Sequence, residues 1–368
     1  MKVLFDAFWF VAGPPSQRHV LRDMISAWSI TFPHDEIALL VRSKHEAAAR
    51  AELSDEVRVF ATKAYPQALL ASRSLARVGT TWGADVVVAH NYAPRYRRGV
   101  SALFLHDVLF LENPEWFTAV ERGYFGIMPR LAPRADVVFT SSSTEADRIR
   151  RLTRSREVVP VGIGLSAELT EVPSVRPETG PLRALTAHGY VLAVGRLNIR
   201  KNLARVIAAC LDGDLVDVDN PLVIVGSGDG KADDFTSDVS RAVEAGIVVF
   251  AGFVQDRELR WLYENSACLV FASLGEGFGM PPVEAAHFGT PVVVSDLPVF
   301  RETVGDVAFF VDPHSESSIA AGIIEAISSR EGSGRKDAAG VTRYGWTSSV
   351  TLMRSAIENR IQARNESS

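Results

Sequence analysis

Two carboxylates mark the stretch of the sequence in which chemistry is most strongly indicated. Glu276 and Glu284 lie eight residues apart in SLGEGFGMPPVEAAHFG, which runs from residue 273 to 289. Glycines surround the first carboxylate, and paired prolines precede the second. Glycine lets a ligand approach the backbone closely, and proline suits the first turn of a helix. The pattern predicts a glycine-rich turn that enters a helix, with Glu284 in the first helical turn.

The N-terminus of such a helix suits phosphate or another anionic oxygen, because its amides are free and its dipole end is positive. The prolines have no N–H, so other residues must supply the amides. We expect these donors to be Gly277, Phe278, Gly279, Met280 and Val283. Both carboxylates are expected at the carboxyl end of a strand, where open α/β sheets bind ligands. The alternative is a solvated turn residue at 276 and a residue at 284 that only complements the helix dipole.

A second motif, GRLNIRKN from Gly195 to Asn202, follows an apolar run and opens a helical pattern. Arg196 and Lys201 are placed to reach a pyrophosphate, the first through a planar fork and the second as a point charge. Arg200 is interpreted as the exposed one of the three cations. The alternative is a solvated basic loop.

Single residues at the ends of other apolar runs give weaker signals. Gly226 is interpreted as part of a tight turn near a nucleotide, and Phe253 and Val254 as residues that present backbone groups to a base. His106 and His90 each end an apolar run, and a histidine there could position or polarise a sugar hydroxyl. Plain strand-end packing and a structural histidine are the respective alternatives.

Other features of composition set limits on the chemistry. The sequence has no His/Cys cluster with metal-ligand spacing, so we expect neither a metal nor a cofactor. Cys210 and Cys268 lie in apolar segments and are predicted to be core thiols. Serines at 141–143 before Glu145 predict a helix cap.

Short apolar runs alternate with amphipathic stretches in both halves of the chain, which predicts parallel sheets covered on both faces. We therefore predict an α/β protein with two doubly wound parallel-sheet domains that face each other across a cleft. The predicted parts are a first domain over 1–165, a proline-rich linker over 166–189, a second domain over 190–345 and a C-terminal helix over 346–368 that packs back toward the first domain.

Charge is unevenly distributed on a chain of net charge −5, since basic residues exceed acidic ones only in the first half. That excess predicts an anionic acceptor or a membrane surface opposite the first half, with an ordinary solvated surface as the alternative. Nucleic acid is not expected, because no aromatic residues interleave the basic run of Arg148, Arg150, Arg151, Arg154 and Arg156. The N-terminus lacks a signal-peptide pattern and reads as a core strand, so a cytoplasmic location is expected.

Taken together, these stretches resemble the retaining glycosyltransferases of family four, which have the GT-B fold with two Rossmann-like domains. The first motif resembles the E-x7-E signature of that family, and the second resembles its donor phosphate loop. The segments that carry the resemblance are GEGFGMPPVEAAHFGTPVVVSD, VGRLNIRKN, AGFVQDRELRWLYENSACLVFAS, FLHDVLFLENPEWF and VVPVGIG.

The resemblance implies a role for each motif. Glu284 would bind the ribose of a nucleotide-sugar, and Glu276 would contact the donor sugar. Arg196 and Lys201 would hold the diphosphate and stabilise it as the leaving group, with His106 near the reacting carbon. The family implies retention of configuration without a metal, through an oxocarbenium-like transition state.

The acceptor side departs from the family, whose N-terminal loop often carries paired glycines. Here that loop has a single glycine, so Gly13, Arg18 and His90 are weak acceptor-side candidates. The resulting prediction is a mannosyltransferase-like hexosyltransferase that uses GDP-mannose in polysaccharide or glycolipid synthesis, with peripheral contact at the inner face of the plasma membrane. A nucleotide-sugar epimerase of the same fold and a catalytically degenerate scaffold subunit are the alternatives.

Overall fold

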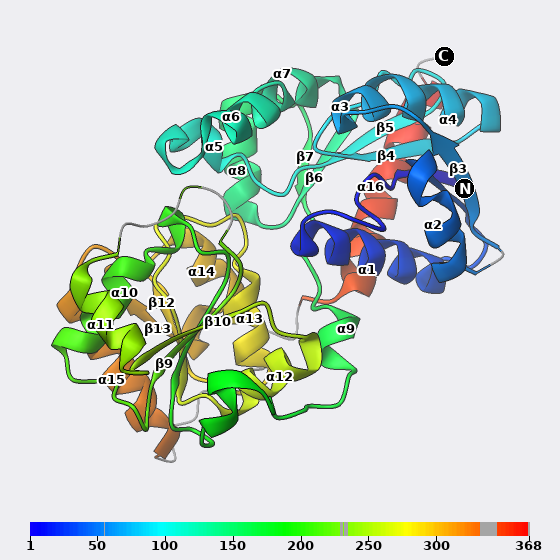
Figure 1. The fold of residues 1–368 in the computed structure, drawn as a ribbon. Helices are drawn as coiled ribbons and strands as arrows, with labels where there is room; N and C mark the ends of the chain where they lie inside the picture. The colour runs from blue at the N-terminus through cyan, green and yellow to red at the C-terminus, as the bar shows by residue number, and fades with distance from the viewer. Residues whose placement is uncertain (55, 229–230, 232–234, 332–343, 367–368) are drawn as a thin grey trace. The chain divides into compact units, whose positions relative to one another are not determined.

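The computed structural model describes residues 1–54, 56–228, 231, 235–331 and 344–366 (Figure 1). The chain divides into two compact units. The first unit comprises residues 1–111, 122–166 and 344–368, and the second comprises residues 112–121 and 167–343. Each unit contains one parallel sheet, as the alternation of apolar and amphipathic segments predicted.

The sheet of the first unit has seven parallel strands in the order β3-β2-β1-β4-β5-β6-β7. They are β1 (Lys2–Asp6), β2 (Glu36–Arg42), β3 (Arg58–Thr62), β4 (Val86–His90), β5 (Val100–Phe104), β6 (Val137–Thr140) and β7 (Val158–Pro160). Every residue of β4 and β5 is buried, which explains their continuous apolar runs. The strand order reverses between β1 and β4, so the carboxyl ends of these two strands flank a switch point, where such sheets bind ligands.

Helices connect these strands in sequence. They are α1 (Pro15–Thr31), α2 (Glu46–Glu52), α3 (Gln67–Leu69), α4 (Ala76–Trp82), α5 (Leu109–Glu112), α6 (Ala119–Phe125), α7 (Met128–Leu131) and α8 (Ser143–Thr153). The predicted cap of α8 is confirmed, because the Ser142 hydroxyl accepts a hydrogen bond of 3.0 Å from the Glu145 amide. The last helix of the chain, α16 (Trp346–Glu366), packs against α1 and against the sheet at β5 and β6.

The sheet of the second unit has six parallel strands in the order β10-β9-β8-β11-β12-β13. They are β8 (Val191–Val194), β9 (Leu222–Val225), β10 (Val248–Gly252), β11 (Cys268–Phe271), β12 (Val292–Ser295) and β13 (Ala308–Val311). Here the order reverses between β8 and β11. The loops that follow these two strands are the two motifs with the strongest chemical signal in the sequence.

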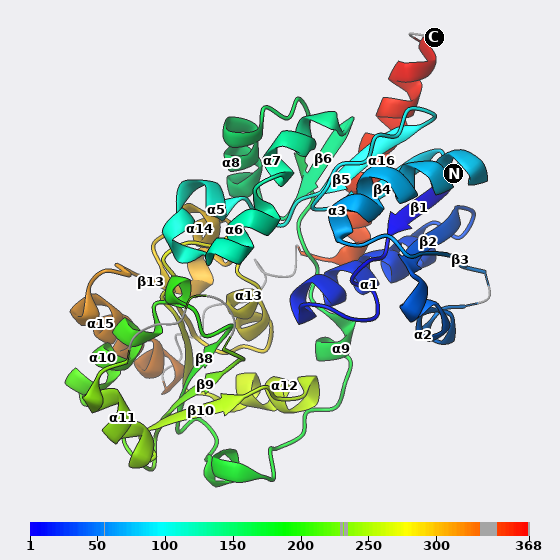
Figure 2. The ribbon, with the colours of Figure 1, turned by 45° about the horizontal axis from the view of Figure 1, so that its top comes forward.

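Helices cover both faces of this second sheet. The helices of this unit are α9 (Ala167–Thr170), α10 (Leu203–Asp212), α11 (Ser237–Glu244), α12 (Asp256–Asn265), α13 (Met280–His287), α14 (Pro298–Thr303) and α15 (Glu316–Glu331). Figure 2 shows α10, α11 and α15 on one face of the strands, and α12 and α13 on the other. Cys210 of α10 and Cys268 of β11 are free thiols buried in the core of this unit, as predicted.

The predicted division of the chain differs from the structure at one place and cannot be compared with it at another. Residues 112–121 group with the second unit, although the prediction placed them in the first domain. The predicted end of the second domain at residue 345 adjoins residues 332–343, which lie outside the described residues. Among the described helices, none is both long enough and apolar enough to cross a membrane.

Candidate functional site

A buried carboxylate between two cations lies at the switch point of the second sheet. The Lys201 ammonium donates a hydrogen bond of 2.7 Å to Oε1 of Glu276. The Arg200 guanidinium donates one of 2.7 Å to Oε2. Glu276 is only 7% exposed, so the alternative of a solvated turn residue is wrong. The loop after β8 and the glycine-rich turn after β11 therefore meet through this charged cluster of Arg200, Lys201 and Glu276.

Backbone and amide contacts hold the two loops together independently of the charges. Asn202 adopts a left-handed conformation with φ 58°, which asparagine tolerates better than most residues. Its side-chain amide donates to the carbonyl oxygens of Ala272, at 3.0 Å, and Pro313, at 2.7 Å. The Leu274 amide donates to the Arg200 carbonyl at 2.9 Å. These contacts fix the register in which the cations face the carboxylate.

Electrostatics keep all members of the charged cluster ionised at neutral pH. Burial alone would raise the pKa of Glu276, but the charges of Arg200 and Lys201 outweigh it and lower the pKa to about 2. Burial lowers the pKa of Lys201 to about 8, although the Glu276 carboxylate opposes this shift. The Lys201 ammonium also lies 4.2 Å from the centroid of the Phe271 ring, a cation–π contact. The cluster carries a net positive charge, which suits an anionic ligand.

The position of Arg200 corrects a prediction made from the sequence. Arg200 was expected to be the exposed cation of its loop, but its side chain is only 12% exposed. It also donates to the Gly275 carbonyl at 2.9 Å. Arg196 is instead the exposed cation of the loop. A short 3-10 turn over Ile199–Lys201 brings both neighbouring cations to one carboxylate, which spacing alone did not reveal.

The second carboxylate of the motif has a different environment. Glu284 is half-buried in the second turn of α13, because the helix begins at Met280; the prediction of the first turn is wrong. The Tyr263 hydroxyl, from α12, donates a hydrogen bond of 2.7 Å to Oε2 of Glu284. Burial raises the pKa of Glu284 to about 7, although that hydrogen bond opposes the shift. This carboxyl therefore titrates near neutrality, whereas Glu276 does not.

The turn between the carboxylates is closely packed. Gly277, Phe278 and Gly279 are buried, as is Val283, and Met280 is half-buried. Gly279 precedes α13 with φ 84°, and a Cβ there would overlap the Phe300 ring. A side chain at this position would therefore both strain the backbone and displace a core aromatic.

The carboxyl ends of β8, β9 and β10 lie side by side. The Gly195 amide donates to the Val225 carbonyl, and the Gly226 amide donates to the Gly252 carbonyl, both at 2.9 Å. A Cβ on Gly226 would overlap the carbonyl oxygen of Gly195, so this loop requires glycine. Its residues 229–230 lie outside the described residues.

The residues predicted to reach a base lie just beyond β10. Phe253 is 75% exposed, which is unusual for a large aromatic side chain, whereas Val254 is buried. An exposed ring at the end of a strand offers a flat surface to a ligand. The prediction for Phe253 and Val254 concerned their backbone groups, and it stays a prediction.

A buried polar network occupies the switch point of the first sheet, and its centre is Gln67. Gln67 is 1% exposed, and its amide nitrogen donates to Oδ2 of Asp6 and to the His90 carbonyl, both at 3.1 Å. Its amide oxygen accepts three hydrogen bonds, from Trp9 at 3.1 Å, Asn91 at 3.3 Å and Tyr124 at 2.8 Å. Burial raises the pKa of Asp6 to about 6. No cation contacts this network in the contacts found among the described residues.

Two histidines lie beside that network. The rings of His90 and His106 are 6.0 Å apart between centroids. Burial lowers the pKa of His90 to about 3 and that of His106 to about 4, so both are neutral at pH 7. Within the described part of the chain, the buried Nε2 atom of each has no hydrogen-bond partner. Both histidines are therefore available to a ligand only as neutral imidazoles.

Glu145 stabilises the loop that follows His106, a role that the sequence did not predict. Glu145 is fully buried; it accepts a hydrogen bond of 2.8 Å from the Val108 amide and forms an ion pair with Arg148. Burial raises the pKa of Glu145 to about 8. The serine run before it predicted only the helix cap.

The weak acceptor-side candidates lie at the start of the first unit. Gly13 is exposed with φ 147° and packs on the Trp9 ring, and Arg18 is half-buried in α1. Gln67 donates a hydrogen bond to the His90 carbonyl. Among the contacts found in the described residues, the Gln67 network hydrogen-bonds to neither of the other two candidates. The roles of Gly13, Arg18 and His90 on the acceptor side stay predictions.

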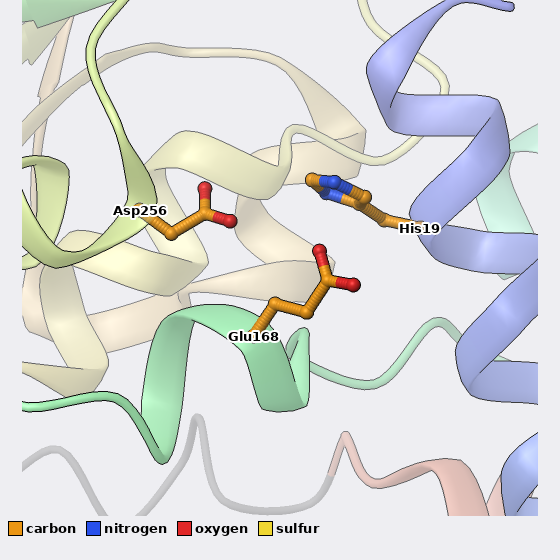
Figure 3. A group of neighbouring side chains, drawn as sticks. All are labelled: His19, Glu168 and Asp256. Atoms are coloured by element: carbon orange, nitrogen blue, oxygen red, sulfur yellow. The ribbon is translucent and has the colours of Figure 1, made fainter. Parts of the chain in front are cut away.

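Figure 3 draws three residues with metal-ligating side chains, His19, Glu168 and Asp256. Glu168 and Asp256 belong to the second unit, in α9 and α12, and their ligand atoms lie within 4.8 Å of each other. His19 belongs to α1 in the first unit. Because the group is divided between the units, we assign no metal site to it. The expectation that the chemistry needs no metal stays a prediction.

Comparison with known proteins supports a glycosyltransferase. Residues 183–340 match the family model of the group 1 glycosyl transferases. The serotype-specific mannosyltransferase WbdA of Escherichia coli is 28% identical over 270 residues, which are 69% of this chain and 33% of WbdA. The chain thus spans about a third of the length of that relative. The O-antigen chain mannosyltransferase B of Escherichia coli is 27% identical over 272 residues, 71% of this chain and 70% of the relative.

Solved structures show the same fold over nearly the whole chain. Sucrose-phosphate synthase from Thermosynechococcus elongatus aligns with a TM-score of 0.70 at 17% identity, covering 99% of this chain and 100% of that one. HepE of Anabaena, in complex with UDP, aligns with a TM-score of 0.67 at 19% identity, covering 98% and 100%. The predicted GT-B class, with two doubly wound parallel-sheet units, is confirmed. These structures show the fold, and the match to the group 1 glycosyl transferase model is confined to residues 183–340.

Proposed function

We propose that this protein is a retaining, metal-independent glycosyltransferase. It moves a hexose, with mannose preferred, from a nucleotide-diphosphate sugar such as GDP-mannose to a glycan or lipid-linked acceptor. The observation that carries the proposal is the charged cluster of Arg200, Lys201 and Glu276 at the switch point of the second sheet. The two mannosyltransferase relatives favour mannose, and the UDP complex of the HepE structure favours a nucleotide donor for this fold.

In the proposed reaction the diphosphate is held by Arg196 and Lys201. Their positive charge stabilises the negative charge that develops on the leaving diphosphate, which is the role a metal ion has in other transferases. The bond between the anomeric carbon and the diphosphate oxygen breaks. The acceptor hydroxyl forms a new bond on the same face and transfers its proton to the departing diphosphate, so configuration is retained.

Carboxylates and backbone orient the donor. Glu276 contacts the sugar, assisted by the backbone of Gly277, Phe278 and Gly279. Glu284 accepts hydrogen bonds from the ribose hydroxyls, and Phe253 and Val254 lie at the base. His106, a neutral imidazole by its lowered pKa, acts near the reacting carbon as a hydrogen-bonding group and adds no positive charge to the oxocarbenium-like centre.

The first unit is proposed to bind the acceptor, with Gly13, Arg18 and His90 as the candidate contacts. Its polar network contains hydroxyl, amide and indole groups without a cation, which suits the neutral hydroxyls of a glycan. We further propose a cytoplasmic location with peripheral contact at the inner face of the plasma membrane, which the basic excess of the first half supports.

Transfer assays with GDP-, UDP- and ADP-sugars test this function. We expect one donor class to be consumed, and Glu276→Ala and Lys201→Ala to abolish transfer. The matched control is Arg301→Gln, which removes an exposed ion pair with Asp296. Wild-type rates in both site variants would refute the site assignment. Isomerisation of the nucleotide-sugar without an acceptor would instead favour the epimerase alternative.

A further inference from the structure

We propose that Arg200 is a positioning residue that holds Glu276 ionised and in place, so that Lys201 can leave it for the diphosphate of the donor. This inference rests on the proposed function. The inference assigns a role to Arg200, which the sequence had suggested was only an exposed cation. Arg200 itself is not proposed to contact the donor.

The geometry gives each cation its own oxygen of the carboxylate. Lys201 takes Oε1 and Arg200 takes Oε2, each at 2.7 Å. The loss of one cation therefore leaves the hydrogen bond of the other intact. The two cations are not competitors for one acceptor, and the carboxylate can keep one partner while the other moves.

Arg200 is the more firmly held of the two cations. The same nitrogen that contacts Glu276 also donates to the Gly275 carbonyl at 2.9 Å, and the Arg200 carbonyl accepts from the Leu274 amide. These bonds attach Arg200 to the glycine-rich turn that carries Glu276. Lys201 reaches the carboxylate through a single ammonium group on a flexible four-carbon stem. Of the two cations, Lys201 is therefore the one that can change partner more easily.

Burial makes the second counter-ion necessary. Glu276 is almost fully buried, and a buried carboxylate that loses its partner is strongly destabilised. If Lys201 were the sole counter-ion, its movement to a diphosphate would leave that carboxylate unpaired. Arg200 removes this cost, because Glu276 retains one charge-assisted hydrogen bond throughout. Lys201 can then bind the donor diphosphate while Glu276 keeps an ionic partner.

The test measures nucleoside diphosphate binding by titration calorimetry in four proteins: wild type, Arg200→Gln, Glu276→Gln and the double variant Arg200→Gln/Glu276→Gln. In Arg200→Gln, Glu276 retains Lys201 as its sole counter-ion, so GDP or UDP affinity should fall about tenfold, in line with the worth of a hydrogen bond to a charged group. In the double variant Lys201 is released, and affinity should recover to within about threefold of wild type. Transfer by the double variant should stay low, because the Glu276 carboxylate is missing.

A conservative variant tests whether Arg200 acts through its positive charge or through the shape of its guanidinium. Arg200→Lys keeps a positive charge that can donate to Glu276, so diphosphate affinity should stay near that of wild type. Arg241→Gln, which removes an ion pair exposed on both sides, is the matched control. Thermal denaturation of every variant checks that the second unit remains folded.

Two results would overturn the inference while leaving the proposed function standing. These are wild-type diphosphate affinity in Arg200→Gln, and a double variant that binds no better than Arg200→Gln. A wild-type protein that binds no nucleoside diphosphate would refute the proposed function itself, and the inference with it.

Discussion

The switch points of the two sheets have the same topology and opposite electrostatics. Between β1 and β4, the buried Gln67 amide donates to Asp6 and accepts from neutral donors. The Asp6 carboxyl has no cation among the contacts found in the described residues. Between β8 and β11, the carboxylate of Glu276 lies between two cations. The contrast indicates different ligands at equivalent edges: neutral hydroxyl groups at the first and an anion at the second.

This difference lies in side chains and not in the backbone architecture. Both sheets are parallel, and both reverse their strand order between the third and fourth strands, yet the loops that follow carry different chemistry. Function in such folds depends on the groups placed at the strand ends. The following predictions test whether the two sites are as independent as their electrostatics suggest.

The largest effect is expected from Lys201→Ala. Loss of the ammonium removes charge stabilisation of the leaving diphosphate, and we expect kcat/KM to fall by at least about a hundredfold. Gln67→Leu, at the other switch point, should leave nucleoside diphosphate affinity unchanged. Steady-state kinetics and calorimetric titration measure the two quantities. Equal losses of diphosphate affinity in both variants would contradict the proposed division of labour.

The sequence predicted the charged cluster in part, because its ingredients lie in two local motifs. Residue type and spacing identify both motifs in the sequence. One holds the glycines, prolines and carboxylates at 275–284, and the other holds the cations at 196–201. The pairing of Arg200 with Glu276 joins residues 76 positions apart, and only the fold brings them together. Spacing could not distinguish Arg200 from Arg196.

The first switch point was hardly visible in the sequence. Its centre is a glutamine at the start of a short helix, and glutamine carries no specific chemical signal. The indications were His90, which ends an apolar run, and Asp6, an acidic residue that ends an otherwise apolar strand. The fold class was predictable throughout, because buried parallel strands show themselves as continuous apolar runs.

The next largest effect is on stability. Gln67→Leu removes five hydrogen bonds from a buried network and leaves Asp6 with fewer donors. We expect the free energy of unfolding to fall by about 2–4 kcal/mol. Urea denaturation measures the change. The matched substitution Gln255→Leu, at an exposed helix start, should cost much less, and similar losses in both would contradict a structural role for the network.

A smaller effect concerns pH and the donor. The pKa of Glu284 is raised to about 7, so the carboxylate form that accepts hydrogen bonds from ribose accumulates as pH rises through that value. We therefore expect the KM for the donor to decrease between pH 6 and 8. Tyr263→Phe removes a donor to the carboxylate and should move the midpoint to higher pH. Glu284→Gln should abolish the dependence, and a variant that retains it would contradict the assignment.

A further effect is an acid-dependent loss of stability in the first unit. The pKa values of His90 and His106 are lowered from 6.5 to about 3 and about 4, so the unfolded chain binds more protons below pH 6.5. Stability should fall as pH drops from 6.5 toward 4, by up to ~1.4 kcal/mol per pH unit for each histidine. Asp6, raised from 3.8 to about 6, acts in the opposite sense over that window and reduces the slope.

Urea denaturation at several pH values measures this slope, with His90→Asn as the test variant and the exposed His287→Asn as its matched control. His90→Asn should flatten the acid limb, whereas the control should retain it. An unchanged slope in His90→Asn would show that this histidine is not held neutral by burial.

The central claim is that Lys201 of the charged cluster, together with Arg196, binds the diphosphate of a nucleotide donor. Its most direct test compares the affinities of a nucleoside diphosphate and the corresponding nucleoside for wild type and for Lys201→Ala. Wild type should bind the diphosphate far more tightly than the nucleoside, and Lys201→Ala should reduce this difference by at least about tenfold. An undiminished difference in Lys201→Ala, or no difference in wild type, would contradict the claim.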